Sequence, residues 1–163
     1  MINNNLHNVF LGLGSNLGNR EKYIHCAIEK INEKIGEVIS LSSFYTTTPV
    51  GFISNNKFLN AACHITTSFI PLEILKITKE IEIELGREIK SSNGEYYDRK
   101  IDIDILLFDS LISNNFELTL PHPHLHERSF VLFPLEEIAT NVLHPVLNKT
   151  IGELKKDWIK SNK

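Results

Sequence analysis

The chain has few cysteines, no long apolar run and no excess of basic residues, and each of these absences argues against one class of protein. Its 163 residues include only Cys26 and Cys63, both inside apolar patterns, which favours a reducing compartment over a disulfide framework. No apolar run reaches the ~20 residues that cross a bilayer, and the N-terminus lacks the features of a signal peptide. A formal charge of −3 argues against a nucleic-acid-binding surface. We therefore expect a cytoplasmic protein with no membrane or nucleic-acid partner. We expect its anionic ligand to be a small molecule.

The sequence also shows no repeat, low-complexity tract or linker that would divide it. With 42% hydrophobic residues, a chain of this length can bury one substantial core. We expect a single domain over residues 1–163, in which residues 1–8 form a loosely ordered N-terminus.

The apolar spacing predicts strands over residues 9–13, 38–45, 61–69 and 99–108, and helices over residues 20–35 and 71–85. Asn19 is expected to cap the first helix, Gly36 to end it in the left-handed conformation, and Gly86 to mark the end of the second helix. A weaker pairing segment at 116–120 and short helices at 130–139 and 152–159 follow. This order is typical of an α+β fold with a ferredoxin-like βαββαβ core, in which helices pack on one face of an antiparallel sheet, here with C-terminal additions.

The most informative segment is the last predicted core strand. Side chains alternate between the two faces of a strand, so Asp102 and Asp104 share one face and the neighbouring isoleucines share the other. Two carboxylates on one face repel each other, and a hard divalent cation would explain their presence, because Mg²⁺ takes one or two carboxylates together with water and phosphate oxygens. Arg99 lies just upstream, and its planar guanidinium has the geometry to bind a phosphate. A solvated edge strand with alternating charge is the alternative.

Other motifs are weaker when taken singly. The glycine-rich segment at 12–18 has the spacing GxGxxxG, which excludes a dinucleotide fingerprint and a P-loop. It favours a tight strand-to-helix turn, and a turn packed beneath a substrate is the alternative. Phe58 and Asn60 share a strand face, so they could stack on a planar ligand and read its edge, although a core Phe and a turn Asn are the more common case.

The histidine-rich loop at 121–128 leaves two interpretations open. Alternate histidines with a carboxylate could bind zinc, which would make the protein a metal-dependent phosphohydrolase that uses the aspartate pair. We prefer a single phosphate-facing histidine, His122, with His124 and His126 solvated. A ferredoxin-like binding module without catalysis is a further alternative, since this fold has many functions.

Taken in order, the motifs resemble the 6-hydroxymethyl-7,8-dihydropterin pyrophosphokinase family over residues 9–158. They are GSNLG at 14–18, SFYTT at 43–47, FLNAA at 58–62, Gly86-Arg87, RKIDID at 99–104, Pro121-His122 and RSFVLFPL at 128–135. The resemblance implies pyrophosphate transfer from ATP to the hydroxymethyl group of the pterin, with release of AMP, in folate biosynthesis. ATP is then the co-substrate, and we expect the protein to be a monomer.

The resemblance also implies roles for individual residues. Two Mg²⁺ ions would bind Asp102 and Asp104, and the implied catalytic residues are Arg87, Arg99, Asp102 and Asp104. ATP would contact Leu75, Lys79, Glu82, Arg87, Arg99, Ile105, Thr119, His122 and Arg128, although Lys79 and Glu82 could also be a helix-surface pair. The pterin would contact Thr47, Thr48, Val50, Phe58, Asn60, Tyr96, Asp102 and Phe130.

Departures from the family pattern lie around the phosphate site. Tyr97-Asp98 replaces the small residues usual before Arg99, and Glu117 and Pro123 replace a basic and an aromatic residue found in some members. Polar segments at 88–98 and 46–56 lie between elements that carry candidate ligands, so we expect them to act as lids over the substrates.

Overall fold

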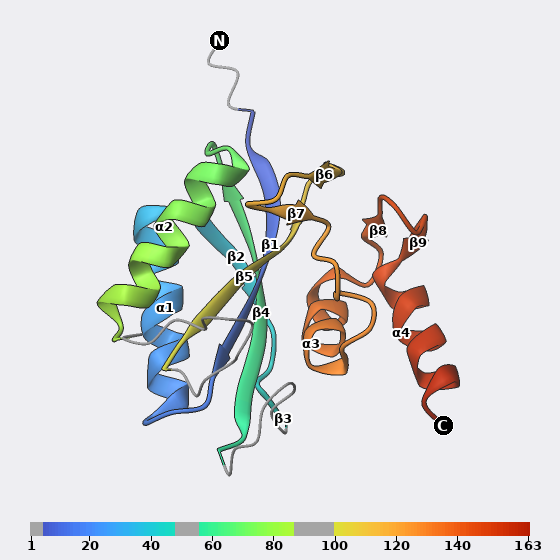
Figure 1. Ribbon diagram of the computed structural model, residues 1–163, viewed down its shortest axis with the longest axis horizontal. Coiled ribbons are helices and arrows are strands. Elements are labelled where there is room, and N and C mark those ends of the chain that lie inside the picture. Colours follow the sequence, from blue (N-terminus) through green and yellow to red (C-terminus); the bar gives the residue numbers. More distant parts are fainter. Residues whose placement is uncertain (1–4, 48–55, 87–99) are drawn as a thin grey trace.

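A computed structural model describes residues 5–47, 56–86 and 100–163 (Figure 1). The elements up to residue 108 alternate as the sequence predicts, and their sheet has the order β2-β4-β1-β5, with β3 paired to β4 and every pairing antiparallel. This is the strand order of a ferredoxin-like sheet, so the predicted fold class is confirmed. The elements are β1 (His7–Ser15), α1 (Arg20–Lys34), β2 (Glu37–Leu41), β3 (Tyr45–Thr47), β4 (Phe58–Thr67), α2 (Pro71–Glu84) and β5 (Asp102–Phe108).

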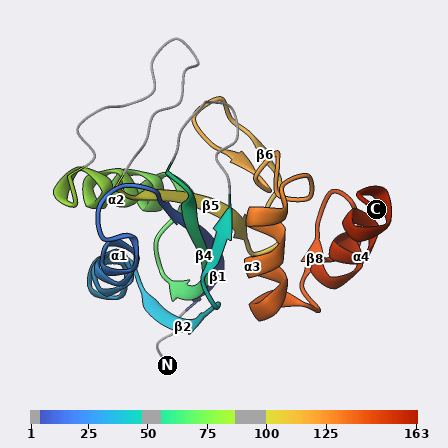
Figure 2. The same ribbon diagram turned by 90° about the horizontal axis from the view of Figure 1, so that it is seen from below.

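The C-terminal part adds a second helical layer. Helices α1 and α2 cover one face of the sheet, while α3 (Ser129–Ala139) and α4 (Ile151–Ser161) lie on the opposite side (Figures 1 and 2). The expectation of helices on one face therefore holds for the βαββαβ core alone. Two short hairpins flank α3: β6 (Ser113–Asn114) with β7 (Thr119–Leu120), and β8 (Leu143–His144) with β9 (Lys149–Thr150). Only the first was anticipated, as the weak pairing segment.

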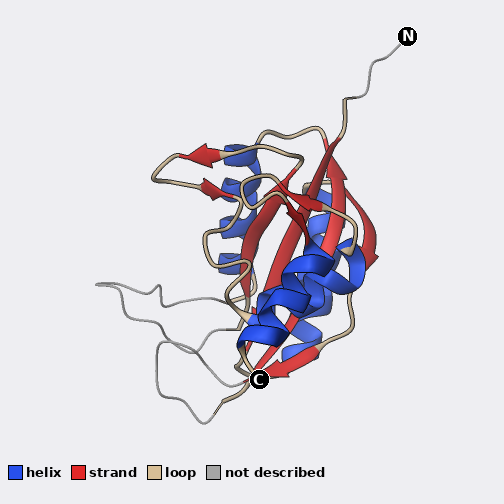
Figure 3. Cartoon of the chain, turned by 90° about the vertical axis from the view of Figure 1, so that its right-hand side faces the viewer, coloured by secondary structure: helices blue, strands red, loops and turns tan. Residues whose placement is uncertain are grey.

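Two apolar cores result, one on each face of the sheet. Ile101, Ile103 and Ile105 join the core with α1 and α2, as the alternation in β5 predicts. The β1–β5 register shifts between Phe10 and Leu11, which places both Leu106 and Leu107 in the core beneath α3 and α4. Figure 3 shows the sheet seen from the side of these C-terminal helices. In the part of the chain that the structure describes, no helix is long and apolar enough to cross a membrane.

All four predicted core strands differ from their predicted bounds, and the strand predicted over 99–108 is observed as Asp102–Phe108. β1 runs on to Ser15, so Gly14 lies in the strand and not in a turn. β4 begins at Phe58 and includes the pair that was expected to precede it. The strand predicted over 38–45 is divided into β2 and β3, because the Ser42 hydroxyl accepts a hydrogen bond from the Ala62 backbone N–H at 2.9 Å in place of a regular ladder contact.

The helix ends follow the expected local chemistry with one exception. The Asn19 side chain accepts the Lys22 N–H at 3.1 Å and caps α1, and Gly86 has φ +95° after α2. Gly36, in contrast, is not left-handed. A Cβ at Gly36 would lie 2.1 Å from the carbonyl oxygen of Thr66, so glycine is required there by close approach to β4 and not by backbone conformation.

Candidate active site

A cavity of about 460 Å³ opens on the α3 side of the sheet and continues around the edge of β5 toward α2. Every site residue predicted from the sequence that lies in the described part of the chain lines this one cavity: Thr47, Phe58, Asn60, Leu75, Lys79, Glu82, Asp102, Asp104, Ile105, Thr119, His122, Arg128 and Phe130. Arg87, Arg99, Thr48, Val50 and Tyr96 lie outside the described residues, as do the segment 88–98 and most of the segment 46–56, so the lid prediction stays open.

The floor of the cavity is built by alternating residues of three paired strands. Asp102 pairs with Gly14 and Asp104 with Gly12, so both carboxylates come from the face of β5 that looks away from α1. Gly14 also pairs with Asn60 on its other side. A Cβ at Gly14 would lie 3.1 Å from Asn60 Oδ1 and 3.5 Å from the Phe58 ring. The glycine therefore keeps open the space between the Asp102 carboxylate and the Asn60 amide.

Gly12 and Gly14 line the cavity, although neither was among the predicted site residues. Their spacing favoured a plain strand-to-helix turn over a turn packed beneath a substrate. A glycine inside a strand often marks a place where a ligand or another backbone approaches closely. Alternate glycines in one strand, next to alternate aspartates in its neighbour, are the signal that could have identified them.

One end of the cavity combines an aromatic wall with an amide. Asn60 is buried, and its Nδ2 donates to Thr47 Oγ1 at 2.7 Å across the β3–β4 pairing. Phe58 lies half-buried in the same strand, opposite Thr47. Phe130 comes from the first turn of α3, on a different element. We call these four residues the pterin slot, after the ligand that the family resemblance implies for them: Thr47, Phe58, Asn60 and Phe130.

His122 and Arg128 bring polar and cationic groups over the floor. The His122 N–H donates to the Leu106 carbonyl at 2.9 Å, which ties the loop to β5, and a cis peptide bond precedes Pro121. Burial, followed by the charge of Arg128 and the proximity of His124, lowers the pKa of His122 to about 4. The guanidinium carbon of Arg128 lies 5.8 Å from the centroid of the Phe130 ring. Above this pKa a neutral imidazole therefore lies beside a permanent cation.

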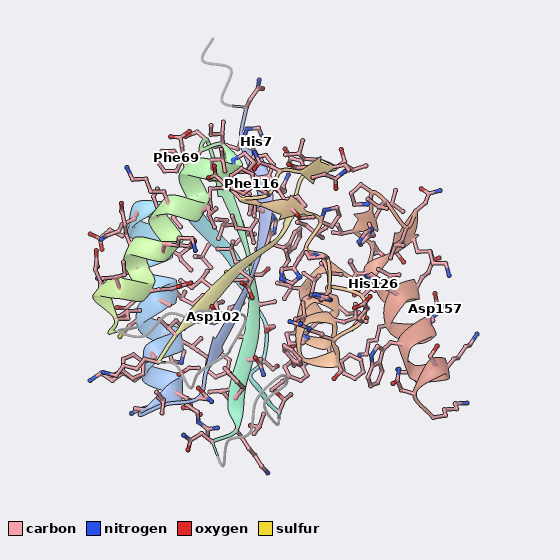
Figure 4. The ribbon with its side chains drawn as sticks, in the orientation of Figure 1. His7, Phe69, Asp102, Phe116, His126 and Asp157 are labelled. Carbon is pink, nitrogen blue, oxygen red and sulfur yellow. The ribbon has the colours of Figure 1, made fainter. Side chains whose placement is uncertain are left out.

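The other two histidines of this loop separate in space. His124 lines the cavity, and its Nδ1 lies 2.9 Å from Glu127 Oε2, so it belongs to the cavity rim as well as to solvent. His126 lies instead in a different groove beside Trp158 of α4, and Figure 4 shows it well apart from Asp102. Among residues 5–47, 56–86 and 100–163, no three His, Cys, Asp or Glu side chains gather into a possible metal site. The zinc alternative therefore has no ligand set within those residues.

At the other end of the cavity, α2 meets the edge of the sheet. Glu82 is buried, and its Oε1 accepts the backbone N–H of Ile103 at 3.1 Å, which fixes the free edge of β5 to the helix. The interpretation of Lys79 and Glu82 as a plain surface pair does not account for this burial. Glu117 and Leu118 of the β6–β7 hairpin complete this end, and neither was among the predicted site residues.

Comparison with known proteins decides among the remaining alternatives. Residues 10–140 match the family of 7,8-dihydro-6-hydroxymethylpterin-pyrophosphokinases. The chain belongs to this family. Its activity is thus the transfer of pyrophosphate from ATP to hydroxymethyldihydropterin in folate synthesis.

Relatives cover most of the chain. A pyrophosphokinase of Porphyromonas gingivalis is 46% identical over 138 residues, which are 84% of this chain and 93% of that protein. The Aquifex aeolicus pyrophosphokinase is 42% identical over 147 residues, or 90% and 89% of the two chains. Among solved structures, a triple mutant of Plasmodium falciparum HPPK-DHPS with pteroate has a TM-score of 0.78 at 18% identity. That match covers 98% of this chain but 44% of the Plasmodium chain, so it shows a shared fold for one part of a longer protein.

Proposed function

We propose that Asp102 and Asp104 hold Mg²⁺ in this pyrophosphokinase, and that ATP and the dihydropterin meet above them in the cavity. The observation that carries the proposal is the convergence of both aspartates, Arg128 and the pterin slot on one cavity. The donor set fits Mg²⁺, because two carboxylates on a strand can supply protein ligands while water and phosphate oxygens complete the octahedron. We expect two such ions, as in the family resemblance.

The pterin end would bind by stacking and by edge recognition. Phe58 and Phe130 come from the sheet and from α3, so a flat bicyclic ring can lie between their elements. The buried Asn60 amide offers both a donor and an acceptor to the ring edge, and its bond to Thr47 holds it in place. Thr48, Val50 and Tyr96 remain proposed pterin contacts that lie outside the described residues.

The nucleotide end would place the triphosphate across the aspartates. Leu75 and Ile105 supply apolar surface for the base, while Lys79, Glu82 and Thr119 supply polar groups around the nucleoside. Arg128 and the neutral His122 would contact the phosphates, together with Arg87 and Arg99. In this arrangement the pterin hydroxymethyl oxygen lies next to the β-phosphorus, and AMP is the leaving group.

The chain's own groups contribute mainly by position and charge. Phosphoryl transfer depends on alignment of the attacking oxygen and on neutralisation of the charge on the phosphates, more than on a strong base. Asp102 and Asp104 would hold Mg²⁺, and the ion would supply positive charge that neutralises the charge on the phosphates. Arg128 adds a permanent cation near the same phosphates, and the stacked slot keeps the hydroxymethyl group from turning away.

We also propose that the protein works as a monomer in the cytoplasm. The predicted site residues within the described ranges all line one cavity of a single chain, which supports a site that one copy can form. Cys26 and Cys63 are both free thiols, as expected in a reducing compartment.

The test is AMP release by the purified protein. The proposal expects AMP from ATP only when both the dihydropterin and Mg²⁺ are present. Hydrolysis of ATP without pterin would favour the phosphohydrolase, and binding of both ligands without AMP would favour a non-catalytic module. EDTA followed by addition of Mg²⁺ supplies the matched control for the metal.

A further inference from the structure

Glu137 makes an unusual set of contacts for an exposed carboxylate. Its Oε2 accepts the Ser43 backbone N–H at 3.0 Å and the Tyr45 hydroxyl at 2.9 Å, and its Oε1 accepts the Ser43 hydroxyl at 2.6 Å. These hydrogen bonds, that of the Ser43 hydroxyl first, lower the pKa of Glu137, while burial and then Glu137 itself raise the pKa of Tyr45 to about 12. One helix side chain thus holds three donors of a short segment more than 90 residues away in sequence.

The segment held by Glu137 leads directly into one wall of the pterin slot. Tyr45 begins the three-residue strand β3, and among the described strands β3 pairs with β4 alone. Tyr45 lies opposite Asn60, and Thr47 lies opposite Phe58 while it accepts the Asn60 amide. A shift of β3 would therefore move the Thr47 hydroxyl and, through it, the amide that reads the ring edge.

The helix that carries Glu137 also carries the other wall. Phe130 lies seven residues earlier in α3, which is two helical turns and hence on the same side of the helix. α3 packs against both β3 and β4. The separation of the two slot walls is consequently the separation of α3 from the β3–β4 edge, and Glu137 provides polar links across that gap.

We infer that Glu137 is a positioning residue for the pterin slot: by tying Ser43 and Tyr45 to α3, it sets the spacing between the Thr47–Phe58–Asn60 wall and Phe130. The inference rests on the proposed function of the slot. Glu137 is not among the described residues that line the cavity, so we expect it to act through the slot and not by contact with the substrate. Its role is thus distinct from those of the groups that bind the pterin.

The neighbouring residue offers a matched control. Glu136 Oε2 contacts Lys155 of α4 at 3.2 Å, and the Glu136 carboxyl is also 3.4 Å from the Thr140 hydroxyl, so it braces α3 on the side away from the slot. Glu136→Ala removes a carboxylate of the same size and charge from the same helix. Glu137→Gln keeps one acceptor oxygen and should give a smaller effect than Glu137→Ala. Tyr45→Phe removes only one of the three donors.

The measurement is the KM for each substrate, with thermal unfolding in parallel. Glu137→Ala should raise the pterin KM by about tenfold, since hydrogen bonds to a charged group contribute on the order of such a factor. The ATP KM and the melting temperature should stay close to those of Glu136→Ala. In a double variant, Tyr45→Phe should add little to Glu137→Gln, because both act on the same link.

Three results would overturn the inference. The first is an unchanged pterin KM in Glu137→Ala, and the second is an equal rise of the pterin KM and the ATP KM in that variant. The third is a rise of the pterin KM alone in the control Glu136→Ala. The Phe58→Ala variant tests whether the slot binds the pterin at all, independently of the role inferred for Glu137. If Phe58→Ala raises the pterin KM and Glu137→Ala does not, only the role of Glu137 is wrong; if neither does, the slot assignment and the inference fall together.

Discussion

Immediately before β5, Ile101 lies in the apolar core beneath α1 and α2, whereas the next residue, Asp102, lies on the cavity side of the sheet. Ile101 is fully buried and surrounded by apolar side chains, while Asp102 is only partly buried and borders open space. The period of two in a strand thus assigns adjacent residues to different tasks. We expect Ile101 to contribute to stability and Asp102 to contribute to binding of the metal and to catalysis. Substitutions one position apart should separate the two.

The largest effect is expected at the aspartate pair. Asp102→Asn or Asp104→Asn keeps the side-chain volume but removes a charged metal ligand, and kcat should fall by about 10³-fold, because a metal ion stabilises the transition state by several kcal/mol. The free energy of unfolding should change by only about 0.5 kcal/mol, as for other substitutions outside a core. Mg²⁺-dependent AMP release and thermal unfolding measure the two quantities. Normal turnover in both variants would contradict the metal assignment.

Ile101→Ala should show the opposite pattern. Deletion of a fully buried side chain leaves a cavity, so the free energy of unfolding should fall by about 2–5 kcal/mol. Ile101→Val, the milder control, should cost about 0.5–1.5 kcal/mol. Turnover per folded molecule, measured well below the melting temperature, should stay within a few-fold of the wild type. A loss of kcat as large as that of Asp102→Asn, without unfolding, would mean that the two faces of β5 are not separable.

Phe58→Ala tests the comparison inside the α3 face. Loss of stacking should weaken binding of the pterin by about 1–3 kcal/mol and leave an ATP analogue unaffected. Phe133→Ala is the control, because its ring contacts Trp158 at 5.2 Å between centroids and does not line the cavity. It should lower stability without any preference for one ligand. Titration calorimetry with a non-hydrolysable ATP analogue present distinguishes them, and equal losses for both ligands in Phe58→Ala would make Phe58 a structural residue.

The local sequence predicts most of the framework because its signals are short-range. The alternation in β5, the Asn19 cap and the end of α2 next to Gly86 each depend on residues within one turn or strand, and the structure has all three. Gly36 shows the limit: its need for glycine comes from the Thr66 carbonyl on another element, and no local pattern contains that contact.

The candidate site divides in the same way. Asp102 and Asp104 form a local pattern that a bound metal ion would explain. Taken alone, Phe58 and Asn60 are typical of a core Phe and a turn Asn, and only the ordered set of motifs indicates that they bind a ligand. Gly14 and Glu137 were missed because their importance lies in contacts with strands and helices distant in sequence. Local chemistry can thus identify ligands, but the groups that shape the space around them depend on tertiary packing.

The smallest effect is expected at Glu84, on the α1–α2 side. Its carboxylate contacts Lys30 Nζ at 2.7 Å and Lys34 Nζ at 2.5 Å, which links α2 to α1 and lowers the pKa of Glu84 to about 2 from an ordinary value of 4.5. A lowered pKa stabilises the fold above the unfolded-state value, and this stabilisation is lost as the pH falls from 4.5 toward 2. Because the pair is exposed, the gain is small and screened by salt.

Glu84→Gln should therefore lower the melting temperature slightly near neutral pH, and the difference from the wild type should shrink as the pH falls below 4.5. High salt should reduce the same difference in melting temperature at neutral pH, because it screens exposed charges. Turnover should not change, since Glu84 lies outside the cavity. Unfolding curves across this pH range, with and without salt, provide the measurement. If the difference in melting temperature persists both at low pH and in high salt, the effect comes from helix packing and not from charge. A change in kcat would connect the α1–α2 face to the site.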